Sequence, residues 1–83
     1  MKYELFKQIA LAVDVPEHNL KTGDIATVVD HFPSGNNKED GYALEFFNVL
    51  GDTVLVTILS ESQLTSFTED EVLNARHRLA EAA

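Results

Sequence analysis

The sequence predicts a small, mainly β domain, with a five-stranded barrel over residues 1–67 followed by an amphipathic C-terminal α-helix over residues 68–83. Three observations predict this class. Runs rich in β-branched and aromatic residues alternate with turn signals through most of the chain. The final stretch instead carries apolar residues at helical spacing. A length of 83 residues accommodates a single domain with a modest core.

The predicted strands are short and are bounded by Pro, Gly, Asn and Asp. In the first, Ile9, Leu11 and Val13 alternate with polar or small residues, which is the pattern of a strand with one buried face. Pro16 lies beyond its end because proline donates no ladder hydrogen bond. The five strands are expected at residues 8–13, 25–32, 42–47, 53–59 and 64–67.

The strand at residues 53–59 is apolar on both faces, which predicts that it bends round a closed barrel or is covered on its outer side. A single 3₁₀ turn at residues 60–64 leads into the short last strand. Five short strands joined by hairpins and one tight corner favour a small SH3-like barrel, with an OB-like barrel as the alternative.

The C-terminal helix is predicted from its start signal and its apolar stripe. Thr68 and Glu71 have the spacing of a capping box, and Val72, Ala75 and Leu79 recur at helical spacing. A helix of this length is marginal alone in water. It therefore requires a surface, which is its own barrel, a second protein or a second copy of the chain in a homodimer.

The charge is strongly acidic and unevenly distributed. The net charge is −8, and residues 1–38 contain five acids and four bases, whereas residues 39–83 contain nine acids and two arginines. No Lys or Arg occurs from Glu39 to Ala75. This asymmetry indicates a surface that attracts a basic partner protein, or a surface that serves solubility alone.

Composition excludes several classes of function. The acidic balance argues against direct binding of nucleic acid, which requires clustered Lys and Arg. The longest apolar run is about five residues, against the roughly 20 of a membrane-spanning helix. No cysteine is present and no secretory signal is recognisable, so we expect a cytoplasmic protein without disulfides or thiolate metal sites.

No catalytic or metal-binding motif stands out, and we expect neither a cofactor nor an enzyme. The three histidines are far apart and lack metal-ligand spacing. Asp14, Glu17 and His18 lie in one loop, where an acid–base pair could form, and a small hydrolase is an alternative hypothesis. A solvated polar loop is the simpler interpretation.

Five segments together resemble a known family, and the most specific of them runs from Leu20 to Val29. The others are Gln8–Glu17, Gly41–Phe47, Val54–Leu59 and Ser62–Leu64. The chain resembles, over residues 3–67, a bacterial and often cyanobacterial family of small SH3-like domains, catalogued as a domain of unknown function (number 4926). The resemblance implies no catalytic residues and no cofactor. It implies a small partner protein encoded beside another small reading frame, as an antitoxin or immunity component would be.

The leading hypothesis is thus a non-catalytic module that binds a basic partner protein, as an antitoxin or immunity-type inhibitor. The alternative is an accessory subunit of a larger cytoplasmic complex. The residues expected to contact the partner are seven acids and three apolar residues of the helix: Glu39, Asp40, Asp52, Glu61, Glu69, Asp70, Glu71, Val72, Leu73 and Leu79.

Overall fold

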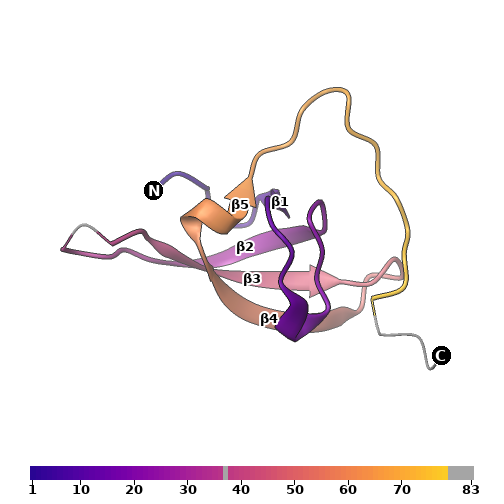
Figure 1. Cartoon of the computed structure of the whole chain (residues 1–83), viewed down its shortest axis with the longest axis horizontal. Coiled ribbons are helices and arrows are strands. Elements are labelled where there is room, and N and C mark those ends of the chain that lie inside the picture. Colours follow the sequence, from indigo (N-terminus) through magenta and orange to yellow (C-terminus); the bar gives the residue numbers. More distant parts are fainter. Residues whose placement is uncertain (37, 79–83) are drawn as a thin grey trace.

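The computed structural model describes residues 1–36 and 38–78 and shows one antiparallel sheet of five strands (Figure 1). The strands are β1 (Gln8–Leu11), β2 (Ile25–Phe32), β3 (Gly41–Phe47), β4 (Thr53–Ser60) and β5 (Leu64–Thr65). Two 3₁₀ turns, η1 (Pro16–His18) and η2 (Glu61–Gln63), interrupt the connections. The strand order is β4-β3-β2-β1-β5. Strands β1 to β4 are therefore sequential neighbours, and the chain then crosses the sheet to place β5 beside β1.

Local sequence accounts for the hairpins. The β3–β4 turn is held by the Asn48 side chain, whose Oδ1 accepts hydrogen bonds from the backbone N–H groups of Leu50 (2.9 Å) and Asp52 (3.0 Å). Gly51 adopts φ 91° in this turn, a left-handed conformation that glycine enters without steric cost. The five predicted strands and the 3₁₀ corner are confirmed, although β1 ends at Leu11 rather than at Val13 and β5 ends at Thr65 rather than at Phe67.

The core lies inside the curve of the sheet and is formed mainly by buried side chains of β1, of β3 and of the first half of β2. The long β1–β2 loop adds Val15 and Leu20, which pair with each other as an isolated bridge and are both buried. The buried cluster consists of Tyr3, Ile9, Leu11, Val15, Leu20, Ala26, Val28, Tyr42, Leu44, Phe46, Leu59 and Leu64.

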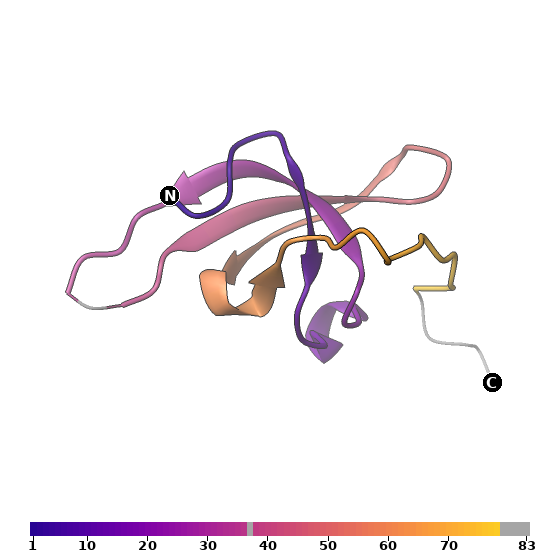
Figure 2. The same ribbon diagram turned by 90° about the horizontal axis from the view of Figure 1, so that it is seen from above.

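The sheet curls but does not close into the predicted barrel (Figure 2). Within the described residues β4 and β5 are its two edges, and no pairing joins them. Because β5 has only two residues, it is too short to bridge back to β4. The architecture is therefore a curled half-barrel.

The predicted C-terminal helix is wrong, because no α-helix occurs in residues 1–36 or 38–78. Residues 68–78, hereafter the C-terminal segment, arch away from the sheet and return toward the β1–β2 loop (Figure 1). The capping contact does form, since the Thr68 N–H donates to Glu71 Oε1 (2.6 Å), but only one turn follows it. Residues 79–83, the rest of the expected helix, lie outside the described residues.

The helix does not form because the apolar side chains of the C-terminal segment are not buried against the sheet. Val72 and Leu73 are 88% and 82% exposed, so their side chains gain little of the burial that stabilises a short helix. The segment is instead held by Arg76, whose guanidinium donates to Asp24 and to the Asn19 carbonyl (3.2 Å). A homodimer built through the C-terminal segment stays a prediction. No described helix has the length and apolarity needed to cross a bilayer.

Candidate functional site

Three of the seven predicted acids meet at the end of the sheet where β3 begins and β4 ends. Glu39, Asp40 and Glu61, hereafter the acidic cluster, are joined through the backbone by a bond from Glu61 N–H to the Asp40 carbonyl (2.9 Å). Glu39 is fixed by Ser62, whose N–H (2.7 Å) and hydroxyl (2.9 Å) both donate to its carboxylate. The carboxylates are thus positioned by η2 and by the β2–β3 loop.

Asp40 connects the cluster to β2 and to the β2–β3 loop. Its carboxylate is bonded to His31 Nε2 (2.7 Å) and accepts the Ser34 N–H (3.0 Å). These two contacts, His31 first, hold the pKa of Asp40 below its usual value of 3.8. Asp40 therefore joins the end of the β2–β3 loop to its beginning, at His31 and Ser34, and also adds negative charge to the cluster.

The Asp40 contacts predict an acid-dependent contribution to stability. Because the folded-state pKa is lowered, this contribution is present above the unfolded value and is lost as the pH falls through the folded one. We expect Asp40→Asn to lower the urea midpoint at about pH 5 and to lie closer to the wild type at about pH 3. An equal difference at both pH values would contradict this role.

Glu61 connects the cluster to the core through Tyr42. The Tyr42 hydroxyl donates to Glu61 Oε2 (2.9 Å) and accepts the backbone N–H of Lys2 (3.1 Å) and of Tyr3 (3.4 Å). Burial, followed by the neighbouring Glu61 carboxylate, raises the pKa of Tyr42. Glu61 is therefore held in place by a fully buried tyrosine rather than by a basic side chain.

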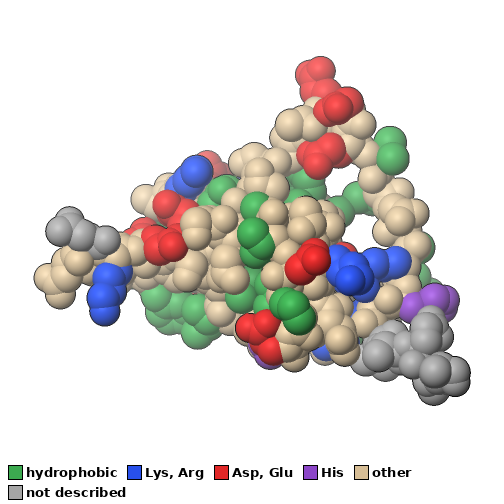
Figure 3. All heavy atoms as spheres, viewed as in Figure 1, with side chains coloured by type: hydrophobic (Ala, Val, Ile, Leu, Met, Phe, Trp, Pro, Cys, Tyr) green, Lys and Arg blue, Asp and Glu red, His purple; other side chains and the backbone are tan. Residues whose placement is uncertain are grey.

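The other predicted acids lie elsewhere. Asp52 is in the β3–β4 turn, at the opposite end of the hairpin from the acidic cluster. Glu69, Asp70 and Glu71 lie at the start of the C-terminal segment, and the acidic side chains at the top of Figure 3 stand apart from those at its left. Thr68 contacts Asp70 (2.5 Å), which lowers the pKa of that carboxyl. The predicted single acidic surface is thus three separate groups.

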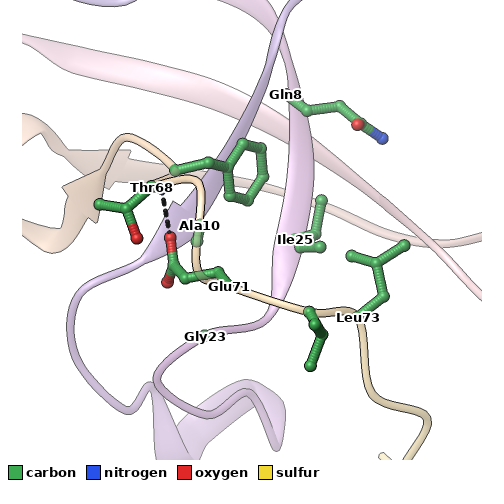
Figure 4. A pocket seen from close by; sticks show the side chains of 9 residues that line it. Gln8, Ala10, Gly23, Ile25, Thr68, Glu71 and Leu73 are labelled. Atoms are coloured by element: carbon green, nitrogen blue, oxygen red, sulfur yellow. Dashed lines mark hydrogen bonds between the residues drawn. The ribbon is translucent and has the colours of Figure 1, made fainter.

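The predicted apolar contacts face a pocket of about 240 Å³ between the C-terminal segment and strands β1 and β2. Val72 and Leu73 line it, together with Ala10 and Ile25 of the sheet. Figure 4 shows the Thr68–Glu71 hydrogen bond at one side of this pocket and Leu73 at the other. Leu79, the third predicted apolar contact, lies outside the described residues.

Sequence reasoning missed an apolar surface on β4. Val54, Val56 and Ile58 point away from the core and are 39%, 56% and 60% exposed. The signal in the sequence is the apolar character of both faces of this strand, which predicts a closed barrel or an outer cover rather than an exposed face. No described strand covers this face.

The loop that suggested hydrolase chemistry has structural contacts. Asp14 Oδ1 accepts the Thr22 N–H (2.8 Å) and hydroxyl (3.0 Å), which lowers the pKa of Asp14. His18 Nε2 lies 3.3 Å from the Thr57 hydroxyl of β4, away from Asp14. Across residues 1–36 and 38–78, no three His, Asp or Glu side chains converge in a way that could hold a metal ion.

Comparison with known proteins gives one match. Residues 5–66 match the model of a family described as Domain of unknown function (DUF4926). No curated protein and no solved structure matches the chain significantly. The matched region covers all five strands and ends just before the C-terminal segment.

Proposed function

The chain belongs to the DUF4926 family, and on this premise we propose that it is a non-catalytic protein-binding module that acts in the cytoplasm on a basic partner protein. Its role would be that of an antitoxin or immunity-type inhibitor. The acidic cluster is the proposed contact surface, since it is the part of the predicted site that the fold brings together.

The observation that carries this proposal is that the cluster is ordered without a Lys or Arg counter-charge among the described residues. Among the described residues, no Lys or Arg forms an ion pair with Glu39, Asp40 or Glu61. Their bonding partners are hydroxyl groups, backbone N–H groups and His31. Carboxylates that are already oriented lose little conformational freedom when Lys or Arg of a partner approaches. Uncompensated charge also accelerates association with a basic surface.

Apolar surface lies next to this charge. Phe32 pairs with Gly41, the residue after Asp40, and its side chain is exposed. Ile58 lies close to Gly41 on the neighbouring strand and is exposed as well. Apolar contact area beside a charged rim is typical of protein interfaces, whereas phosphate binding would need basic residues at this position.

The proposal predicts a local and salt-dependent effect of charge removal. The double variant Glu39→Gln/Glu61→Gln removes two carboxylates and keeps both as hydrogen-bond acceptors. We expect it to bind the basic product of an adjacent gene about 3–10-fold more weakly at low salt, a difference that shrinks as salt screens the charges. Binding is measured by calorimetry with the purified pair.

Glu69→Gln/Glu71→Gln is the matched control, because it removes the same charge from the C-terminal segment. An equal loss in both variants would show that only net charge matters and would contradict the placement of the site. No association at low salt would overturn the proposed function. Elution of the native chain with a large assembly would instead favour the alternative of an accessory subunit.

A further inference from the structure

The two edges of the sheet differ sharply. β5 has two residues and offers little for another strand to pair with. β4 has eight residues and contains no Pro, no Gly and no charged side chain. In the described part of the chain, its backbone hydrogen bonds to other backbone groups are confined to the ladder with β3. Natural sheets normally protect a long edge with charge, proline, a bulge or a covering element. In the described residues, β4 has only a register irregularity at Val54, near its start, and one side chain from another element, His18, that reaches Thr57 (3.3 Å).

The outer face of this edge is also apolar. Val54, Val56 and Ile58 follow one another on the outward side of β4, and Phe47 lies on the same side of β3 with its side chain exposed. In Figure 3 hydrophobic side chains gather below the β3–β4 part of the sheet. An unpaired edge and an apolar face at the same strand indicate a surface that is covered in the working protein.

We propose that the β4 edge pairs antiparallel with β4 of a second copy of this chain, which makes one continuous ten-stranded sheet. Residues directly opposite in an antiparallel pair point to the same face. A two-fold axis at Val56 places Val56 opposite its own copy and Val54 opposite Ile58. Of the possible two-fold registers, this one matches all three outward apolar residues with one another.

At the edge itself charge does not oppose a second copy, despite the net charge of −8, because β4 carries no charged side chain. In this register Asp52 lies at the level of Ser60 of the second copy, and Glu61 follows Ser60 in η2, beyond the paired strands. The two Glu45 side chains, one strand inward from Val56, would be about 14 Å apart, beyond the screening length at physiological salt. The edge itself carries no charge that would select a basic strand. The acidic clusters remain at the two ends of the shared strand pair and free for a partner.

The first test is the oligomeric state. The chain should approach twice its monomer mass of 9.2 kDa with rising concentration in light scattering. Val56→Lys introduces two facing cations at the centre of the interface, and we expect it to be monomeric at concentrations where the wild type is dimeric. Val72→Lys, an equal change on the exposed C-terminal segment, should remain dimeric. A wild-type chain that stays monomeric throughout, as it would if β4 served only a partner's strand, overturns the proposal.

The second test examines the register and does not depend on a disruptive change. The chain has no cysteine, so an introduced cysteine is its only thiol. Directly opposite residues lie within disulfide range, so Val56→Cys should form a covalent dimer on mild oxidation. Val54→Cys alone should not, whereas a mixture of Val54→Cys and Ile58→Cys chains should cross-link to each other. Failure of Val56→Cys to cross-link, or self-linking of Val54→Cys, would rule out this pairing.

Discussion

Tyr42→Ala is expected to remove a large part of the protein's free energy of unfolding. Tyr42 is completely buried near the start of β3. Its ring packs edge-on against Tyr3 (5.5 Å between centroids) and in a tilted arrangement against His31 (5.0 Å). Truncation of a buried aromatic residue costs about 3–5 kcal/mol, and a chain of this length has a total stability of about 4–12 kcal/mol. The loss also removes the group that holds Glu61 and the backbone of Lys2 and Tyr3.

Tyr42→Phe separates packing from hydrogen bonding in the same position. It keeps the ring but leaves the Glu61 carboxylate and two N–H groups without their partner, at a cost of about 1–3 kcal/mol. Urea titrations followed by circular dichroism give both values. Similar midpoints for the wild type and Tyr42→Ala would contradict the central role of this ring.

The sequence predicted the strands well because their signals are local. Residues 25–32 are rich in β-branched side chains between turn signals, and β2 has these bounds in the structure. The network around Tyr42 could not be predicted in this way. Tyr3 and Tyr42 are 39 positions apart, and Tyr3 Oη donates to the Leu64 carbonyl a further 22 positions along the chain (3.1 Å). Such contacts follow from the curl of the sheet and leave no periodic pattern.

The prediction of the C-terminal helix was wrong because the sequence signals of a helix are local, whereas the stability of a short helix depends on packing against the rest of the fold. The Thr68–Glu71 contact forms as predicted, yet a capping contact contributes only about 0.5–2 kcal/mol. The apolar stripe needed a surface that buries it, and Val72, although it lines the pocket over β1 and β2, remains 88% exposed. The ion pair of Arg76 with Asp24, which spans 52 positions, instead holds the segment against the β1–β2 loop.

The candidate site was predicted in part. The charge count located the acids in the second half of the chain, but only the fold shows that Glu39, Asp40 and Glu61 meet while Asp52 lies at the other end of the hairpin. For β4, apolar residues on both faces were visible in the sequence. Whether the outer face is covered depends on sheet closure, which is a property of the whole fold.

Leu11→Ala is the second change with a large expected effect, because Leu11 joins three parts of the structure. Its side chain is 1% exposed, and its residue pairs with Leu64 of β5. Its backbone exchanges hydrogen bonds with the β1–β2 loop, from Leu11 N–H to the Asp24 carbonyl (2.9 Å) and from Gly23 N–H to the Leu11 carbonyl (2.8 Å). Truncation of such a leucine costs about 2–5 kcal/mol.

Val13→Ala is the informative comparison, because Val13 continues the same alternating pattern in the sequence. Periodicity alone assigns Leu11 and Val13 equal burial, whereas in the structure β1 ends at Leu11 and Val13 is 39% exposed. Val13→Ala should therefore change the free energy of unfolding by only about 0.5 kcal/mol. Comparable losses for the two variants in urea titrations would show that the strand runs on to Val13. A small loss for Leu11→Ala would contradict its place in the core.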